Sequence, residues 1–311
     1  MRVFVAGASG AIGRPLIRQL VEAGHQVTGT TRREPRAEQI RAAGATAAVC
    51  DAFDVTALEA AVKEAAPEVV VNQLTSLPED FNPRKIDYTP TNRVREEGGS
   101  NLMRAALAVG ARRYVTQGLA FIYAPEGDWV KSEDDRPFED PPPPFNKAAR
   151  AMLAHERGVL GTEGIEGLVL RYGQFYGPGT YYTPGSGSIA KQVEKRMLPL
   201  IGPGTGMASF IHVEDAAAAT VASLDHGAPG IYNVVDDEPA AVKDWLPPYA
   251  DALGAKTPRH VPVWLARLAG GKMAVQFGVH SRGASNAKAK QTLGWTPRYS
   301  SWRQGFREAL G

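Results

Sequence analysis

The sequence predicts an α/β fold in which a parallel sheet is doubly wound, with helices on both of its faces. Short segments rich in Val and Thr recur through the first 170 residues, amphipathic segments separate them, and the texture changes after Tyr172. Strands that alternate with helical patterns of roughly 10–15 residues are typical of βαβ units. Because crossovers between parallel strands are right-handed, such a series covers both faces of one sheet.

The individual elements follow in regular order. Strands are predicted at 2–7, 26–31, 46–50, 68–74, 112–118 and 167–173, and helices at 11–23 and near 36–43, 56–66, 94–109 and 146–159. The stretch GQFYGPGTYYTPGSGS is too rich in Gly, Pro and Tyr to continue this alternation, and it indicates a loop beside a substrate. Residues 207–224 return to strand and helix, residues 230–239 add a strand with a turn, and the chain from Ala240 has a helical pattern.

Composition excludes several classes of function. The 35 basic and 33 acidic residues are spread along the chain and leave a net charge of only +2, which argues against nucleic-acid or membrane-surface partners and favours a small-molecule substrate. No stretch reaches the ~20 apolar residues of a membrane span, and the chain starts on a strand without a leader, so we expect a cytoplasmic protein. The single cysteine, Cys50, has no partner for a disulfide, redox pair or metal cluster, and we expect it to pack in the core.

Three glycines stand where the first strand meets its helix, in VFVAGASGAIGRPLIRQL. Gly7 permits the tight turn, Gly10 lets a pyrophosphate approach the backbone, and Gly13 lets helix and sheet pack closely. The following helix then offers its unpaired N–H groups and positive dipole end to the phosphates. This pattern predicts a Rossmann-type dinucleotide site. Its expected cofactor contacts in the turn are Gly7, Ser9, Gly10, Ala11, Ile12 and Gly13.

The residues after the second strand indicate which dinucleotide is bound. An NAD site places Asp or Glu there to hold the ribose 2′-hydroxyl, whereas arginine suits a 2′-phosphate. Thr31 occupies this position, and Arg32 and Arg33 follow it. These three residues predict NADP(H), although two arginines in a turn are also compatible with a solvated basic surface.

The G-x-x-G-x-x-G spacing resembles the short-chain dehydrogenase/reductase superfamily. GGSNLMRAALAVGARRYV, LRYGQFYGPGT, SFIHVEDAAAA and SNAKAKQTLGWTPRYS resemble, in this order, elements of its extended branch, the NAD-dependent epimerase/dehydratase family. The resemblance implies a Rossmann domain, a smaller substrate domain built from two segments, and often a homodimer through the fourth and fifth helices. We expect residues 1–171 with 207–235 to bind NADP and residues 172–206 with 236–311 to form the smaller, mainly helical domain.

The resemblance also implies site residues. Asp51 would hold the adenine amino group, and the segment that begins at Arg171 would contact the cofactor at its nicotinamide end. Hydride transfer in this family uses a Tyr-x-x-x-Lys pair and an upstream Ser or Thr. Lys147 fits the lysine, which also holds the nicotinamide ribose, and Thr116 fits the hydroxyl residue, but Pro143 stands where the tyrosine is expected.

The missing tyrosine leaves three alternatives open. Another group can supply the proton, for which Tyr123, Tyr176 and water are candidates. The chemistry can instead need no tyrosine, as in reduction of a polarised double bond or in a redox-neutral step. The protein can also be a non-catalytic NADP(H) sensor. We expect an NADP(H)-dependent oxidoreductase that acts on a carbonyl or alcohol of a small molecule, with a nucleotide-sugar epimerase or dehydratase as the rival enzyme.

Three further groups of polar residues have simpler expected roles. His212 precedes the predicted helix that contains Asp215, and we expect it to cap that helix rather than act in catalysis. The acidic run at 133–135 (Glu133, Asp134 and Asp135) reads as a solvated loop. Tyr181 and Tyr182 either line the substrate site or cover an apolar surface.

Overall fold

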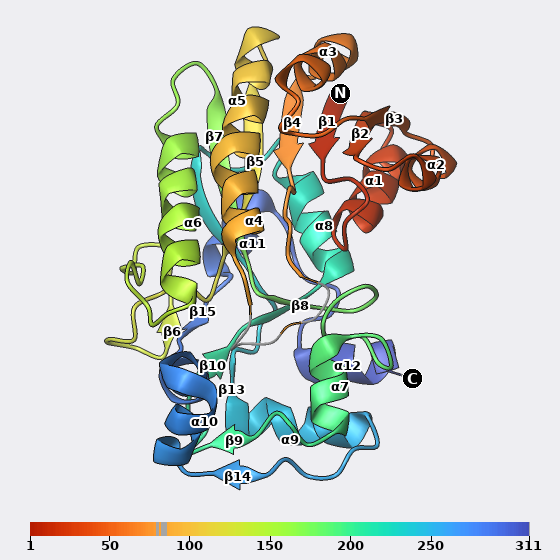
Figure 1. Cartoon of the computed structure of the whole chain (residues 1–311). Coiled ribbons are helices and arrows are strands. Elements are labelled where there is room, and N and C mark those ends of the chain that lie inside the picture. Colours follow the sequence, from red (N-terminus) through yellow and green to blue (C-terminus); the bar gives the residue numbers. More distant parts are fainter. Residues whose placement is uncertain (79–80, 82–85, 311) are drawn as a thin grey trace.

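The structure is a computed structural model that describes residues 1–78, 81 and 86–310. Its centre is a parallel sheet of seven strands in the order β12-β7-β5-β4-β1-β2-β3, as Figure 1 shows. The bounds of these strands are β1 Arg2–Ala6, β2 Gln26–Thr31, β3 Thr46–Val49, β4 Val69–Asn72, β5 Arg113–Leu119, β7 Glu166–Tyr172 and β12 Gly230–Val234. The predicted doubly wound α/β sheet is therefore confirmed. The predicted strand 26–31 matches β2 at both ends, and the other five predicted strands differ from the observed ones by one or two residues at an end.

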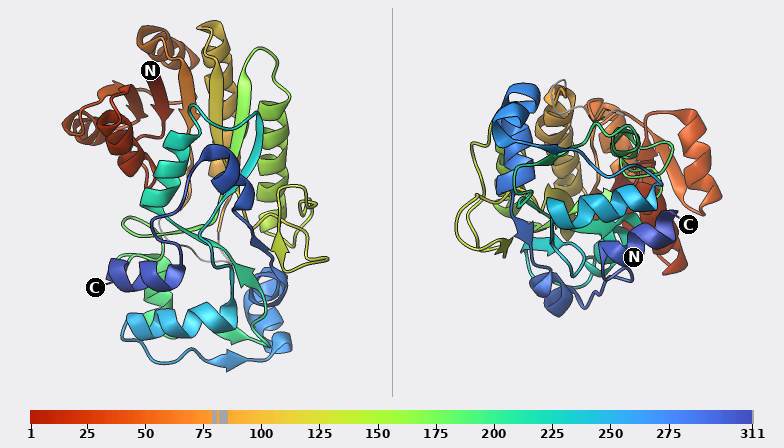
Figure 2. Two further views of the ribbon diagram at one scale, coloured as in Figure 1. Left: turned by 180° about the vertical axis from the view of Figure 1, so that it is seen from behind. Right: turned by 90° about the horizontal axis from the view of Figure 1, so that it is seen from below.

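Side chains of alternate strand residues pack against the helices on opposite faces of the sheet. Val3 and Val5 of β1 pack in one cluster with residues of α1, α2, α8 and α11, whereas Phe4 and Ala6 pack in another with residues of α3, α5 and α6. Both faces are buried, which is why these strands read as continuous apolar runs. The two layers are seen from behind and from below in Figure 2. The bounds of the helices are α1 Gly13–Glu22, α2 Glu34–Ala42, α3 Val55–Ala65, α5 Gly99–Ala108, α6 Phe145–Leu160, α8 Val213–Ala222 and α11 Ala287–Leu293.

The order of the strands creates a crevice beside β1. The chain runs outward from β1 through β2 to β3 and then returns to β4 on the other side of β1. Where the direction of winding reverses, the connections leave the carboxyl ends of β1 and β4 on opposite sides, and ligands of open α/β sheets bind there. The predicted long helix before β5 begins earlier than expected: α4 (Thr89–Arg93) and the π-helix η1 (Val94–Gly98) lead directly into α5.

The remaining elements lie mostly beyond the carboxyl ends of the strands (Figure 1). They include a second core of aromatic side chains, in which Phe210, Trp245 and Phe306 pack together. Helix α11 departs from this arrangement because it packs against β12 and α8, so the division into two domains remains a prediction. The bounds are β6 Val130–Lys131, β8 Gln174–Tyr176, α7 Ser188–Glu194, β9 Leu200–Ile201, β10 Met207–Ala208, β11 Phe210–His212, β13 Ala240–Ala241, α9 Val242–Ala252, β14 His260–Val261, α10 Val263–Val275, η2 Gln276–His280, β15 Gly283–Ala284 and α12 Trp302–Leu310.

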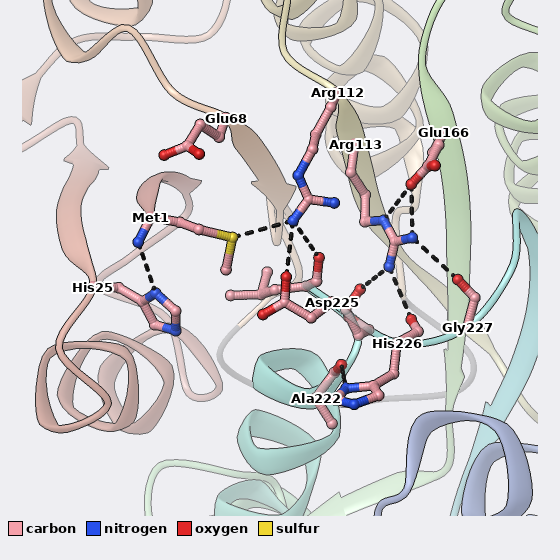
Figure 3. A network of polar contacts seen from close by, with 12 residues as sticks. Met1, His25, Glu68, Arg112, Arg113, Glu166, Ala222, Asp225, His226 and Gly227 are labelled. Atoms are coloured by element: carbon pink, nitrogen blue, oxygen red, sulfur yellow. Dashed lines mark hydrogen bonds and ion pairs between the residues drawn. The ribbon is translucent and has the colours of Figure 1, made fainter.

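A polar network closes the amino end of the sheet, opposite the crevice (Figure 3). Arg113, the first residue of β5, is 5% exposed and directs its guanidinium at Glu166 of β7, with an Nη2–Oε2 distance of 2.6 Å. The same guanidinium donates to the carbonyl oxygens of Ser223, His226 and Gly227, at 2.8, 2.9 and 3.1 Å. A cation is favourable beside the carbonyl groups that end helix α8. This network therefore fastens α8 and the loop after it to the sheet.

Candidate dinucleotide and substrate site

The glycine turn between β1 and α1 is too crowded for side chains. Gly7 has a φ of +87°, and a Cβ atom there would lie 2.6 Å from the carbonyl oxygen of Gln73. At Gly13 a Cβ atom would lie 2.3 Å from the oxygen of Gly7, whereas at Gly10 the corresponding distance to that oxygen is 3.3 Å. Gly7 and Gly13 thus make the tight turn and the close packing, and Gly10 is exposed at the tip.

The start of α1 is free to receive an anion. Ile12 is its N-cap residue and provides no side-chain hydrogen bond, and the first turn carries no acidic residue. The first N–H groups of a helix have no partner within the helix and form an anion site with the dipole. Arg14 adds a positive charge in this first turn, and its Nη2 lies 2.4 Å from where a Cβ of Gly179 would be. The turn therefore fits a pyrophosphate, and the loop that contains Gly179 reaches over it.

The residues expected to choose the cofactor lie at the end of β2. Thr31 is buried and its hydroxyl is 3.3 Å from the hydroxyl of Ser9, which ties β2 to the glycine turn. Arg32 and Arg33 are exposed, and neither forms an ion pair within the described residues. The nearby acids of α2, Glu34 and Glu38, both pair with Arg41. Two guanidinium groups therefore remain available beside the expected position of the ribose.

Asp51 follows β3 at the same edge of the sheet. Its Oδ1 accepts a hydrogen bond of 3.0 Å from the backbone N–H of Phe53, which fixes the carboxylate in the turn. The side chain is half-buried, as expected for a group that keeps one face for a ligand. Arg93 lies over the ring of Phe53, 4.2 Å from its centre. Cys50, just before Asp51, packs partly buried against the core, and this burial raises the pKa of its thiol.

The reacting end has an exposed lysine and no tyrosine four residues before it. Lys147 is exposed on the first turn of α6, and Pro143 is exposed before the helix begins. Thr116, by contrast, is fully buried within β5, and its hydroxyl lies 2.9 Å from Nε2 of His155 on α6. The geometry therefore gives Thr116 a contact inside the sheet and helix layer and no surface for a substrate.

The two alternative tyrosines are buried as well. Tyr123 is 2% exposed, donates to Oδ1 of Asn233 at 2.7 Å and lies under the guanidinium of Arg171. Burial raises the pKa of Tyr123 to about 12. Tyr176 is 1% exposed, packs edge-on against Phe306, and its pKa is likewise raised by burial. Neither hydroxyl is available to protonate a substrate oxygen in this arrangement.

Arg171 itself is held inside the fold. It is 3% exposed and makes a two-pronged ion pair with Glu156 of α6, with Nε–Oε1 and Nη2–Oε2 distances of 3.0 and 2.6 Å. Although burial opposes the charged form, the hydrogen bonds and the charge of Glu156 raise the pKa of Arg171. Its side chain therefore anchors α6 against β7, and its backbone lies in the sheet between β5 and β12, so the expected cofactor contact of this segment stays a prediction.

Aromatic side chains gather around Phe145, two residues before Lys147. The ring of Phe145, at the start of α6, lies 5.8 Å from Tyr88, 6.2 Å from Phe121 and 6.1 Å from Phe277, measured between ring centres. We call these four residues the aromatic cluster. It comes from four separate segments, which is why the sequence alone did not reveal it.

The other polar residues show one confirmed prediction and one correction. His212 caps α8, since its Nδ1 accepts from the N–H of Glu214 at 3.2 Å. The acidic run at 133–135 is not simply solvated. Glu133 accepts from the backbone N–H of Asn233 at 2.7 Å, and Asp135 pairs with Lys131 at 2.9 Å, so the charges order the loop.

Tyr181 and Tyr182 have separate environments. Tyr182 is buried in the second core, where its hydroxyl bonds to Gln174, and this burial raises its pKa. Tyr181 is half-buried, and its hydroxyl donates to the carbonyl of Pro78 at 2.5 Å. Tyr181 thus joins the loop after β8 to the segment that follows β4, at the carboxyl end of the sheet.

Sequence reasoning missed the charged residues that α5 and α6 bury between them and the sheet. Arg95 of η1 is 7% exposed, and Glu156 is 2% exposed. Arg95 lies in the run VREEG, which has the composition of a solvated helix face. Within the described residues, no group of three or more His, Cys, Asp or Glu side chains has a metal-binding arrangement. The described helices are also too short or too polar to cross a membrane.

Comparisons with known proteins agree with this architecture. A 3-diazoavenalumate denitrifying reductase from Streptomyces sp. is 43% identical over 310 residues, which cover 98% of this chain and 99% of the relative. A UDP-glucose 4-epimerase from Corynebacterium glutamicum is 26% identical, and the match covers 100% of this chain and 97% of the relative.

Solved structures show the same fold. The UDP-glucose 4-epimerase of Thermotoga maritima with UDP-glucose has a TM-score of 0.78 at 20% identity, covering 100% of this chain and 97% of that one. The Thermus thermophilus UDP-glucose 4-epimerase in complex with NAD has a TM-score of 0.72 at 24% identity, covering 100% and 98%. The model of the NAD dependent epimerase/dehydratase family matches residues 3–234. The chain therefore belongs to the NAD-dependent epimerase/dehydratase family, whose members use a nicotinamide cofactor.

Proposed function

We propose that this protein is an NADPH-dependent reductase that removes a diazo group from an aromatic substrate. The observation that carries the proposal is that none of the tyrosines considered for the reacting end is placed to donate a proton. Pro143 replaces the expected tyrosine, and Tyr123 and Tyr176 are both buried and packed. The relative with 43% identity over nearly the whole length is a diazo-removing reductase by name, which supports the same class of reaction.

The chemistry explains why the tyrosine is dispensable. A bound nicotinamide cofactor supplies hydride, and a carbonyl carbon that accepts hydride leaves an alkoxide that must be protonated. An arene diazonium carbon that accepts hydride instead loses dinitrogen, so that ArN₂⁺ and H⁻ give ArH and N₂. The electron pair of the broken C–N bond leaves with the nitrogen, and no oxygen is left to protonate. A site without an acid is thus sufficient for this reaction.

The residues have the following roles in this proposal. The turn of Gly7, Gly10 and Gly13 holds the pyrophosphate on the α1 N-terminus, Arg32 and Arg33 hold the 2′-phosphate, and Asp51 holds the adenine. Lys147 holds the nicotinamide ribose. The aromatic cluster around Phe145 receives a planar ring, because aromatic rings pack edge-on or offset with centres about 4.5–7 Å apart.

Reduction of a carbonyl is the second candidate, and the exposure of Lys147 favours it. A lysine that is open to solvent lets water serve as the source of the proton. Redox-neutral nucleotide-sugar chemistry and a non-catalytic NADP(H) sensor have no comparable support from this arrangement. A homodimer through α5 and α6 remains a proposal, for which exposed Leu107 and Leu160 on these helices provide apolar surface.

An isotope experiment tests the reaction. With 4-carboxybenzenediazonium and NADPH that is deuterated at both C4 positions, we expect release of N₂ and benzoate with deuterium at the carbon that lost nitrogen. In D₂O with unlabelled NADPH, that carbon should carry hydrogen from the cofactor. The same reaction with the Gly13→Ala variant controls for direct reduction by free NADPH. Deuterium from D₂O at that carbon, or a rate no faster than the control, contradicts the proposal.

The choice of cofactor has a separate test. Replacing Arg32 and Arg33 together by Ser should weaken NADPH binding by about tenfold or more, since two exposed charges near a phosphate contribute roughly 1–2 kcal/mol. Binding of NADH, which has no 2′-phosphate, should change by less than about twofold. Both dissociation constants can be followed by the fluorescence of the reduced cofactor. Tighter binding of NADH than of NADPH by the unaltered protein would exclude NADP selectivity.

A further inference from the structure

Arg95 is a buried cation that forms no ion pair within the part of the chain that the structure describes. It lies in η1, is 7% exposed, and its Nε is fully buried with no hydrogen-bond partner within the described residues. An unpaired buried charge costs several kcal/mol, and folds rarely retain one that has no use. Burial lowers the pKa of Arg95 to about 10, which still leaves it charged at neutral pH.

The charges around Arg95 do not balance it. Glu156 is the acidic group in its electrostatic surroundings, but both oxygens of that carboxylate are bonded to Arg171. His155 is the other titratable neighbour from α6, and burial together with Arg95 lowers its pKa to about 4, so it is neutral. Among the described residues, two arginines therefore share one carboxylate, and Arg95 has no carboxylate of its own.

Tyr88, a member of the aromatic cluster, leads into the helical segment that contains Arg95. Tyr88 is the N-cap residue of α4, and Arg95 follows seven residues later in the π-helix η1 that continues α4; both elements pack against α6. The Tyr88 hydroxyl and the Arg95 guanidinium also lie within electrostatic reach of each other, and long helical side chains lean toward the N-terminus of their helix, which here is the Tyr88 end. That hydroxyl has no hydrogen bond to any other described residue.

The ring of Tyr88 in turn packs on Phe145, with centres 5.8 Å apart. Phe145 precedes Lys147 by two residues at the start of α6. Cation, hydroxyl and aromatic rings thus follow one another where α4–η1 packs against α6, and Lys147 stands on the exposed face of the first turn of α6. This combination of a cation, a hydroxyl and aromatic rings has the polarity that suits an aromatic acid. Its carboxylate fits the planar fork of a guanidinium, which can form two parallel hydrogen bonds.

We propose that Arg95 and the Tyr88 hydroxyl bind the carboxylate of the substrate, and that this protein therefore acts on aromatic carboxylic acids. The proposal rests on the reductase function above and adds the class of substrate to it. The carboxylate neutralises the buried charge when the acid binds, while the ring packs on the aromatic cluster. An uncharged aromatic compound gains the ring contacts alone and leaves Arg95 unpaired.

A binding experiment without turnover tests this site. The protein is saturated with NADP⁺, and binding of cinnamate is compared with that of cinnamyl alcohol, its neutral counterpart, by calorimetry. We expect the unaltered protein to bind cinnamate at least about tenfold more tightly. In Arg95→Met, which keeps the length of the side chain, the two ligands should bind within about twofold of each other. Arg104→Met, an exposed arginine on the adjoining α5, should leave the preference unchanged.

The melting temperature separates binding from a structural role. Because Arg95→Met removes an unpaired buried charge, its melting temperature should stay level or rise. Should that variant fail to fold, Tyr88→Phe gives a second measurement, with an expected loss of about threefold for cinnamate and none for the alcohol. No preference for the acid in the unaltered protein, or a preference that survives Arg95→Met, would overturn the proposal.

The reductase function can fail independently. A protein that binds cinnamate through Arg95 but does not reduce a diazonium acid retains this anion site and loses the proposed reaction. Conversely, a protein that reduces 4-carboxybenzenediazonium and benzenediazonium equally well, and binds acid and alcohol alike, retains the reaction and loses this site.

Discussion

Buried arginines at the two ends of the central sheet differ in their hydrogen bonding. At the amino end, Arg113 uses its guanidinium on Glu166 and on three backbone carbonyls, and the network in Figure 3 holds α8 to the strands. Beyond the carboxyl end, Arg95 buries its Nε without a partner among the described residues, and the first N–H groups of α1 receive no side-chain cap. One end uses its donors within the fold, and the other has donors without partners among the described residues, which we propose bind ligands. Substitutions at the two ends should therefore change different quantities.

The largest effect is expected in the glycine turn. In Gly13→Ala the new Cβ would lie 2.3 Å from the oxygen of Gly7 and 2.5 Å from that of Ala8, so the backbone must move. A displacement of the turn by about 1 Å misaligns the N–H groups, and we expect NADPH binding to weaken by at least about a hundredfold, or roughly 2.7 kcal/mol. Fluorescence titration with NADPH measures this loss.

Gly158→Ala is the matched control for that substitution. Gly158 lies within α6, and a Cβ there meets nothing within 4 Å. Alanine is a better helix former by about 1 kcal/mol, so this variant should be at least as stable as the parent and bind NADPH equally well. Equal binding by Gly13→Ala and Gly158→Ala would mean that the glycine turn does not hold the cofactor.

The second-largest effect is expected for Arg113, at the amino end of the sheet, and it concerns the free energy of unfolding. Arg113→Met removes the donor to Glu166 and to the carbonyls of Ser223, His226 and Gly227. Because Glu166 is half-exposed and can be hydrated, we expect a loss of about 2 kcal/mol in the free energy of unfolding rather than the full cost of a broken buried pair. Chemical denaturation measures it.

NADPH binding by Arg113→Met is the control for this prediction. The folded fraction of Arg113→Met should bind NADPH within about twofold of the parent, since the network lies at the opposite end of the strands. Arg112→Met, whose ion pair with Asp225 is exposed on both sides, should lose less than about 1 kcal/mol. A strong loss of cofactor affinity in Arg113→Met would show that the two ends are coupled and that the division between them is wrong.

The same contrast explains what the sequence could predict. The strands and helices follow local apolar periodicity, and the turn at Gly7 and Gly13 follows local backbone geometry, so both were readable from contiguous residues. His212 was likewise readable, because a cap acts on the next turn of its own helix. The helix predicted around residues 245–253 is present as α9, although it contains Pro247 and Pro248. Packing of Trp245 and Leu246 in the second core outweighs the low helix propensity of the prolines.

Residues whose role depends on distant partners were not readable. Thr116 has the right residue type, but its position places it within β5 against His155, 39 residues away. The aromatic cluster unites residues from 88 to 277, and the imbalance of charge at Arg95 appears only when Glu156 is seen to pair with Arg171. A run such as VREEG has the same composition whether its arginine is solvated or buried. Whether Tyr123 or Tyr176 can donate a proton likewise depends on burial, which spacing does not encode.

The smallest effect concerns His155, which lies between the two ends. Its pKa is lowered from 6.5 to about 4, mainly by burial and further by the charge of Arg95. The unfolded chain therefore binds a proton between pH 6.5 and pH 4 that the folded protein does not, and stability falls as the pH decreases through this window. We expect a loss of roughly 1.5 kcal/mol between about pH 7 and pH 5, somewhat less than the full shift implies because the ring is partly exposed.

Two variants separate the histidine from the cation beside it. In His155→Gln, the amide can still bond to Thr116, and the loss of stability that comes from protonation of His155 should disappear. The smaller losses that come from His25 and His212, whose pKa values are also lowered, should remain. Arg95→Met should reduce the same loss, because without the neighbouring cation the imidazole protonates more readily. Denaturation at a series of pH values measures all three proteins. If the pH dependence of Arg95→Met equals that of the parent, the charge of Arg95 does not reach His155, and the unpaired cation beyond the carboxyl end is screened by solvent.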